Sequence, residues 1–202
     1  MSLHPIHHAD LIKSGLSDQI VKDMQVYSMP PAEIVRRFPK KAEKIESALA
    51  FPYFDIEGKR NGFLRIKVFP DFEENGHTTK YLQMSGTPVH LYILPTVIEL
   101  IKNQEQTIFI VEGEKKTAKV IEAGLCAVGI GGLWSWSDGK TNRAIDDFQT
   151  IKWSDRKVII VPDSDTFADN KKSIKLRHAV YALARELVNS GASVKVKVLP
   201  ND

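Results

Sequence analysis

Residues 107–119 read TIFIVEGEKKTAK, and this stretch decides the fold of the C-terminal half of the chain. The apolar run 108–111 predicts a strand buried in a sheet. It ends in Glu112-Gly113-Glu114, directly before a lysine-rich segment with the composition of a helix. Two carboxylates at the tip of a core strand contribute nothing to packing, so their position calls for a chemical explanation.

Strands and helices alternate regularly from this stretch onward. The predicted strands cover 107–111, 125–130, 157–162 and 194–199, and the predicted helices cover 115–123, a short segment near 143–149, and 171–190. Isoleucine- and valine-rich strands separated by helices are typical of a mainly parallel sheet flanked by helices. Ligand sites in such sheets lie beyond the carboxyl ends of the strands. The sequence therefore predicts an α/β domain over residues 105–202.

The first 104 residues have shorter, interrupted elements and predict a smaller α+β lobe. Helices are expected over 16–24, 30–38 and 40–49, and strands or extended segments over 49–55, 63–68, 80–86 and 90–94. The segments 49–55 and 63–68 are expected to pair as a hairpin. This lobe shows no catalytic motif. The histidines at 4, 7 and 8 are expected on a disordered or exposed N-terminus, the alternative being adventitious metal binding.

Composition restricts the class of protein. The chain has 202 residues, of which 43% are hydrophobic and 26% charged, as in ordinary globular proteins. It contains no apolar run near the ~18–20 residues of a membrane-spanning helix, and its N-terminus lacks a secretory pattern. The lone Cys126 excludes an internal disulfide framework and a cysteine zinc site. We therefore expect a cytoplasmic protein that does not enter a membrane.

Two acidic clusters follow predicted strands of the sheet. Glu112 and Glu114 follow the first strand, while Asp163 and Asp165 follow strand 157–162. Clustered carboxylates raise one another's pKa unless a cation lies among them, and Mg²⁺ prefers oxygen ligands. No histidine or cysteine lies close in sequence to either cluster, which argues against zinc. The alternative is that these side chains cap the helices that follow.

Lysines gather beside these acidic tips, at Lys115, Lys116, Lys171 and Lys172. The net charge of +3 is too small to establish a nucleic-acid partner by itself. Phosphate contact is one interpretation of the lysines, and a solvated helix face is the other. Gly113 supports phosphate contact, because a sharp turn there lets backbone amides at a helix N-terminus face a phosphate.

The segment GIGGLWSWSDGK, residues 129–140, allows two interpretations. Its glycines could let the backbone approach a nucleotide, with Trp134 or Trp136 stacked on a base. Alternatively, the two tryptophans cover the edge of the sheet.

Several motifs together resemble a known family. Glu112 in IVEGEKK, followed by Asp163-Ser164-Asp165 after a hydrophobic strand, resembles the Toprim domain of bacterial replicative primases, type IA and II topoisomerases and related nucleases; this resemblance covers about 105–202. The whole chain is similar to a Toprim-like family of primase-related phage and plasmid proteins, often found ahead of a helicase or ATPase region. The segments that carry this second resemblance include SGLSDQIV, KYLQMSGTPVHLYILP, VEGEKKTAKVIEAGLCAVGIGGLWSW, VPDSD and GASVKVKVLP.

The resemblance implies roles for the acidic residues. Glu112 would be the general acid/base or a metal-organising carboxylate, and Asp163 and Asp165 would bind Mg²⁺ (or Mn²⁺). Glu114 would be a helper and a further candidate metal ligand. The metal would neutralise the phosphates of an incoming nucleotide.

The chain also departs from the primase pattern. Primases usually follow Asp-x-Asp with a small residue and glycine, whereas here Asp165 precedes TFADN, in which Asp169 is a further ligand or a cap. The zinc-ribbon cysteines of replicative primases do not occur, and family members usually continue beyond the position of residue 202.

These features lead to one functional hypothesis and two alternatives. The first is a Mg²⁺-dependent nucleic-acid-processing protein of a mobile element, acting by primase-like nucleotidyl transfer in DNA replication. Its expected partners are single-stranded DNA, nucleotides, and a helicase or ATPase in cis or in trans. The alternatives are a non-catalytic binding module that serves a helicase, and a Toprim nuclease. Glu112, Asp163 and Asp165 together favour an active metal site, which both synthesis and cleavage would use.

Overall fold

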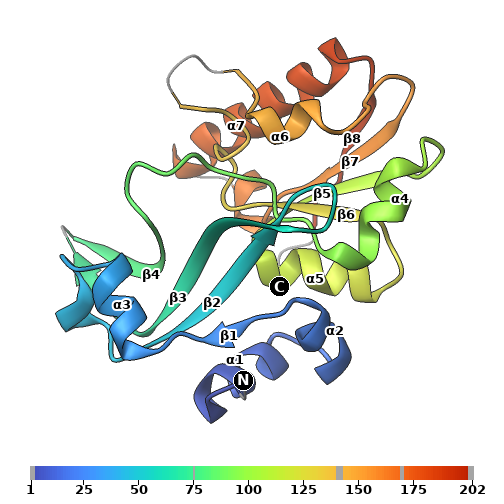
Figure 1. Ribbon diagram of the computed structural model, residues 1–202. Coiled ribbons are helices and arrows are strands. Elements are labelled where there is room, and N and C mark those ends of the chain that lie inside the picture. The colour runs from blue at the N-terminus through green and yellow to red at the C-terminus, as the bar shows by residue number, and fades with distance from the viewer. Residues whose placement is uncertain (1–2, 75, 140–142, 169–170, 200–202) are drawn as a thin grey trace. The chain divides into compact units, whose positions relative to one another are not determined.

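The computed structural model describes residues 3–74, 76–139, 143–168 and 171–199 (Figure 1). The chain divides into two compact units. Unit 1 comprises Met1–Tyr53 and Arg60–Thr87, and unit 2 comprises Phe54–Lys59 and Pro88–Asp202.

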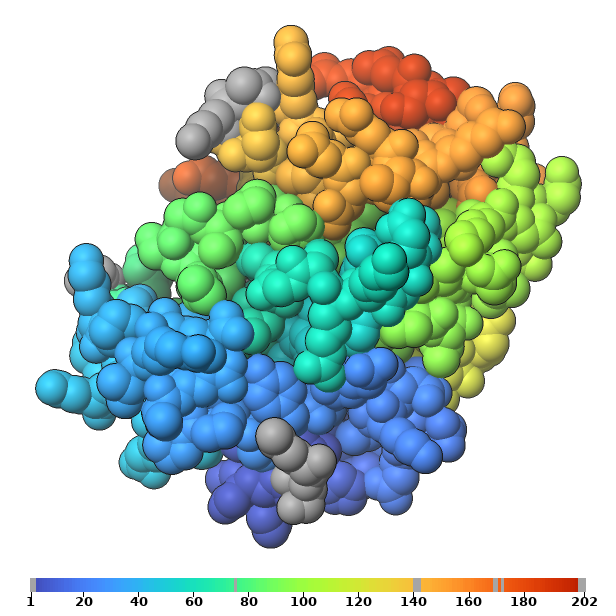
Figure 2. Space-filling model, in the orientation of Figure 1, coloured from blue at the N-terminus to red at the C-terminus, as the bar shows by residue number. Residues whose placement is uncertain are grey.

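Unit 1 is built on an antiparallel sheet. Its strands, in the spatial order β1-β2-β3-β4, are β1 (Tyr27–Ser28), β2 (Ser47–Phe54), β3 (Arg60–Glu74) and β4 (His77–Gln83). Its helices are α1 (Pro5–Lys13), α2 (Asp18–Asp23) and α3 (Pro31–Arg37), with a 3-10 turn η1 (Ala42–Lys44). The N-terminal helices lie at the surface of this unit, in shades of blue (Figure 2). The predicted neighbours 49–55 and 63–68 correspond to the adjacent strands β2 and β3.

Two expectations for unit 1 were wrong. Residues 40–49 are not a helix, because β2 already begins at Ser47 and is buried on both faces, so its apolar residues show no alternation. The N-terminus is not exposed throughout: α1 starts with Pro5 at its first position, and His7 on this helix is only 1% exposed. The His7 ring contacts Ser28 Oγ through Nδ1 (2.8 Å) and Ser47 Oγ through Nε2 (3.1 Å).

Unit 2 has a four-stranded parallel sheet, as predicted. The strands, in the spatial order β6-β5-β7-β8, are β5 (Ile108–Glu112), β6 (Ala127–Ile130), β7 (Lys157–Val161) and β8 (Ser193–Val196). Every neighbouring pair is parallel. The helical elements are η2 (Pro95–Val97), α4 (Ile98–Lys102), α5 (Glu114–Glu122), α6 (Asp146–Gln149), η3 (Ser164–Phe167) and α7 (Lys171–Asn189). Helices flank the sheet: α5 packs on β5 and β6, and α7 packs beside β8 (Figure 1).

A segment of unit 2 that precedes β5 in sequence adds to the edge of the sheet without forming a regular strand. Tyr92 pairs antiparallel with Gly129 of β6 through two backbone hydrogen bonds of 2.8 Å each. Residues 90–94, which were expected to be a strand or an extended segment, therefore pair with the sheet at the bridge of Tyr92.

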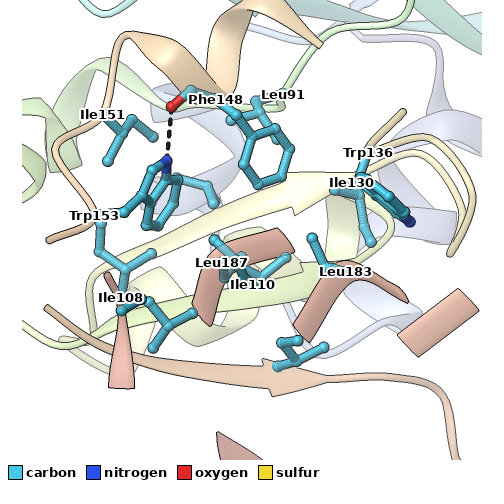
Figure 3. Close-up of a cluster of buried hydrophobic side chains, with 14 of the residues drawn as sticks. Leu91, Ile108, Ile110, Ile130, Trp136, Phe148, Ile151, Trp153, Leu183 and Leu187 are labelled. Carbon is cyan, nitrogen blue, oxygen red and sulfur yellow. Dashed lines mark hydrogen bonds between the residues drawn. The ribbon is translucent and has the colours of Figure 1, made fainter. Parts of the chain in front are cut away.

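One hydrophobic core holds the parallel sheet and its helices together (Figure 3). Ile110 of β5 and Leu183 of α7 are fully buried in it, and such a side chain contributes about 1.5–3 kcal/mol on burial. The Trp153 indole N–H donates to the Phe148 carbonyl (2.6 Å), so the polar atom of this buried ring is satisfied. This core fixes the carboxyl ends of the strands relative to one another.

Candidate active site

Glu112 and Asp163 emerge at the same edge of the parallel sheet. Glu112 is the last residue of β5, and Val111 before it is paired with Val161, the last residue of β7. Asp163 follows two residues after Val161, so it lies beside the point at which β5 ends. The parallel register therefore brings together the two acidic tips that are about 50 residues apart in sequence, as predicted.

The turn after Glu112 depends on Gly113. Its φ of 87° and ψ of 148° lie in a region that side chains disfavour, so glycine allows the chain to turn sharply into α5. The Gly113 carbonyl accepts a hydrogen bond from Thr117 Oγ1 (2.8 Å), and its N–H donates to the Ile130 carbonyl (2.9 Å). The turn is therefore fixed from both sides, and with it the position of Glu112.

The carboxylate of Glu112 lies in a field that disfavours its charge. Burial raises its pKa above the ordinary value, and the neighbouring Asp163 raises it further, as Asp165 does more weakly. The charge of Lys116 and a hydrogen bond with the Asp163 backbone act in the opposite direction. The two aspartates at this edge thus add to the effect of burial in raising the pKa of Glu112.

Lys116 provides the positive charge at the site. Its ammonium forms an ion pair with Asp163 Oδ1, and the two side chains are 59% and 35% exposed. A pair this exposed contributes about 0–1 kcal/mol to stability. The effect of this pair is electrostatic, because the Lys116 ammonium places a positive charge against the carboxylate of Asp163, just after β7.

The other predicted residues divide between this edge and the interior. Asp165 is exposed in η3, and Lys115 is half-buried in the first turn of α5. Glu114 is 2% exposed and lies near Tyr92, where burial and the Glu114 charge hold the Tyr92 pKa well above its ordinary value. Glu114 therefore faces the packed side of α5. Lys171 is exposed in the first turn of α7, whereas Asp169 and the side chain of Lys172 lie outside the described residues.

The two tryptophans have different environments. Trp136 is 4% exposed and packs in the hydrophobic core beside Ile130 (Figure 3), so it covers the sheet and is not accessible to a base. Trp134 is 52% exposed on the turn that follows β6. Only Trp134 retains the accessibility that base stacking requires.

One polar pair near this edge was not predicted. Asp147 of α6 accepts from the Leu91 backbone N–H (2.8 Å), and both of its oxygens lie near His90 Nδ1 (3.1 and 3.2 Å). The two residues are 57 positions apart, and no sequence spacing connects them.

The donor set at the edge suits a hard divalent cation. Glu112, Asp163 and Asp165 offer carboxylate oxygens, and their mutual repulsion is what a cation would relieve. Among the described residues, no three acidic, histidine or cysteine side chains are already gathered as a metal cage. This is compatible with Mg²⁺, which typically takes one or two carboxylates, with waters and substrate phosphates as its other ligands. No helix in the described part of the chain is long and apolar enough to span a membrane.

Comparison with known proteins gives one family and a group of related folds. The family model for the Domain of unknown function (DUF3854) matches residues 98–202. None of the curated proteins matches the chain significantly.

Solved primases share the fold at low sequence identity. The chain superposes on the DnaG primase catalytic domain bound to ssDNA with a TM-score of 0.61 and 16% identity, covering 100% of this chain and 68% of that one. The zinc-binding and RNA polymerase domains of Aquifex aeolicus primase give a TM-score of 0.66 and 15% identity, with 98% of this chain and 50% of that one covered. The E. coli primase catalytic core gives a TM-score of 0.61 and 19% identity, with 98% of this chain and 67% of that one covered. The chain thus spans about half to two thirds of the length of these proteins and has the fold of a primase catalytic core.

Proposed function

The chain belongs to the family of the Domain of unknown function (DUF3854), and we propose that it is a primase-like, Mg²⁺-dependent nucleotidyltransferase that acts in DNA replication. Residues 105–202 form a Toprim domain in this proposal, and residues 1–104 form a primase-type N-terminal lobe. Its ligands are single-stranded DNA and nucleotides. Its proposed protein partner is a helicase or ATPase, in cis or in trans. Its proposed genetic context is a mobile element.

One observation carries it: Glu112 and Asp163 lie side by side at the carboxyl edge of a parallel sheet, and the charges of Asp163 and, more weakly, Asp165 raise the pKa of Glu112. A protein that used this fold only as a binding scaffold would gain nothing from such repulsion. A divalent cation and an anionic substrate would relieve it, and a primase-like catalytic core requires both.

The residues of the chain have separate tasks in this reaction. Glu112, with its raised pKa, is suited to accept and return the proton of the attacking hydroxyl at its carboxylate. Asp163 and Asp165 would hold the metal, which when bound neutralises phosphate charge. Lys116 leaves Asp163 for the substrate, because an exposed ammonium exchanges easily between a carboxylate and a phosphate.

A paired assay tests the proposal. The protein is incubated with Mg²⁺ or Mn²⁺ and nucleoside triphosphates on a single-stranded template, and in parallel with labelled DNA alone. Primer products are expected from the first reaction, and Asp163→Asn should reduce them by more than about a hundredfold, because metal stabilisation is worth several kcal/mol.

Asp155→Asn is the matched control. Asp155 is an exposed aspartate just before β7, whereas Asp163 lies just after that strand. The φ of 60° at Asp155 is a conformation that asparagine tolerates. This variant should synthesise primers as the wild type does. Metal-dependent nicking without synthesis would replace the proposal with a nuclease, and metal-independent DNA binding without either reaction would replace it with a binding module.

A further inference from the structure

Helix α7 packs one face against the sheet and presents large apolar side chains on the other (Figure 1). Its inner face is buried through residues such as Leu183 and Leu187. On the outer face, Ile174, Tyr181 and Val188 are 46%, 57% and 55% exposed. They follow one another at intervals of seven residues, so they form a line about 21 Å long, the apolar stripe. Such a line is typical of a helix face that packs against a second helix.

Basic side chains lie along one flank of the apolar stripe. With about 100° of rotation per residue, Lys175, His178 and Arg185 fall on the same side of the stripe. All three are exposed, and no ion pair joins any of them to another described residue. Glu186, the one acidic residue of α7, is half-buried and lies further round the helix than these three. This basic flank therefore offers its charge to a partner.

A hollow on the same face has the arrangement that receives a side chain from a second helix. Its volume is about 260 Å³, and its lining is formed by His178, Tyr181, Ala182 and Arg185. These residues stand at positions i, i+3, i+4 and i+7, which are neighbours on a helix surface and together surround an inserted side chain in helix–helix packing. Tyr181 and Ala182 give the hollow an apolar part, and Arg185 gives it a positive charge. The hollow therefore suits an apolar side chain with a carboxylate beside it.

We propose that the exposed face of α7 binds an acidic amphipathic helix of a partner protein. One apolar side chain of that helix enters the hollow, and others pack along the apolar stripe. Its carboxylates pair with Lys175 and Arg185 and accept a hydrogen bond from His178, as charged groups do at the rim of an interface. None of these residues belongs to the metal or nucleotide site, so the surface exists whether or not the protein synthesises primers.

Two other occupants match this face less well. A single-stranded nucleic acid would use the basic flank, but its bases would meet Ile174 and Val188, which have no ring on which a base can stack. A second copy of α7 would set cations against cations, because the apolar stripe and its flank contain no acidic residue. An acidic helix matches both the apolar line and the charge.

Synthetic helices of opposite charge test the proposal on the whole chain. Each peptide has about three heptads with leucine at the a and d positions. Glutamate occupies the e and g positions of the acidic peptide, and lysine occupies them in the basic peptide. Fluorescence anisotropy of the labelled peptides measures binding. The acidic peptide should bind in the micromolar range and the basic one at least about tenfold more weakly, because only the acidic peptide brings opposite charges to Lys175 and Arg185.

Substitutions on α7 then locate the bound peptide. Tyr181→Ala should weaken binding of the acidic peptide by about thirtyfold or more, the usual effect of removing a central tyrosine from an interface. Val35→Ala is the matched control, because Val35 lies on α3 and is 58% exposed; it should bind as the wild type does. Lys175→Glu combined with Arg185→Glu should reverse the preference, so that the basic peptide binds more tightly. Thermal melting of each variant checks that it is folded.

Other results overturn the proposal. Absence of binding, equal binding of the two peptides, or equal effects of Tyr181→Ala and Val35→Ala would each show that this face is not a site for an acidic helix. Labelled single-stranded DNA that Tyr181→Ala releases, with no binding of the acidic peptide, would assign the face to nucleic acid. A dimer in sedimentation that Tyr181→Ala dissociates, again with no binding of the acidic peptide, would assign it to a second copy of the chain.

Discussion

Replacing Gly129 with alanine tests how tightly its buried neighbours Thr117 and Tyr92 are packed. Thr117 in turn holds the Gly113 turn that follows Glu112. Gly129 lies in the middle of β6, and a Cβ built on it lies 2.6 Å from Thr117 Oγ1 and 2.9 Å from Tyr92 Cβ. Thr117 and Tyr92 are both fully buried, so neither side chain has free space into which to move. Two backbone hydrogen bonds between Gly129 and Tyr92 also keep Tyr92 from moving away from the added methyl group.

The expected cost follows from these contacts. Introducing one methyl group into a packed site typically costs about 1–3 kcal/mol. A loss of 1 kcal/mol lowers the melting temperature of a chain of this size by about 2–4 °C, so Gly129→Ala should melt about 2–12 °C below the wild type. Primer synthesis should fall as well, because Thr117 Oγ1 holds the Gly113 carbonyl and a displaced Thr117 moves the turn that aims Glu112.

Thermal unfolding followed by circular dichroism measures the effect, and Gly132→Ala is the matched control. A Cβ on Gly132 meets only Ser135 Oγ, at 3.7 Å, so this variant should unfold within about 0.5 kcal/mol of the wild type. Thr117→Ala in the Gly129→Ala background removes the shortest contact, and the pair should cost less than the sum of the two single changes. Equal melting temperatures for Gly129→Ala and Gly132→Ala would refute the reasoning.

Three further predictions concern single side chains. Burial and the neighbouring His4 lower the pKa of His7 below its ordinary value of 6.5, so the folded state binds fewer protons than the unfolded state. The stabilisation that results is present above about pH 6.5 and is lost as the pH falls. Urea unfolding at several pH values should show this loss in the wild type and a smaller loss in His7→Gln. Trp136→Ala should cost about 3–5 kcal/mol of stability, because its ring is in the core. Trp134→Ala should leave stability nearly unchanged and weaken binding of single-stranded DNA, measured by fluorescence anisotropy, by about 1–3 kcal/mol. A destabilised Trp134→Ala, or a His7→Gln variant as pH-sensitive as the wild type, would contradict these assignments.

The parallel sheet was predictable because its signals are local. Apolar runs such as 108–111 are largely buried, and glycines or carboxylates mark where β5, β6 and β7 end. The carboxyl ends of parallel strands meet at one edge, so the meeting of Glu112 with Asp163 followed from sequence and topology rules together. In unit 1 the same method failed for 40–49, since the apolar residues of β2 lack the alternation that distinguishes a strand from a helix.

The sequence by itself determined the order of β5, α5, β6, α6, β7, α7 and β8 in unit 2 and the acidic character of one edge of its sheet. Only the tertiary structure decided where individual side chains point: Glu114 and Trp136 into the packed interior, Trp134 to the surface, and His90 against Asp147. The physical reason is that hydrophobic periodicity is a property of neighbouring residues. Contacts between distant segments depend instead on how complete elements pack, and no short stretch of sequence contains that information.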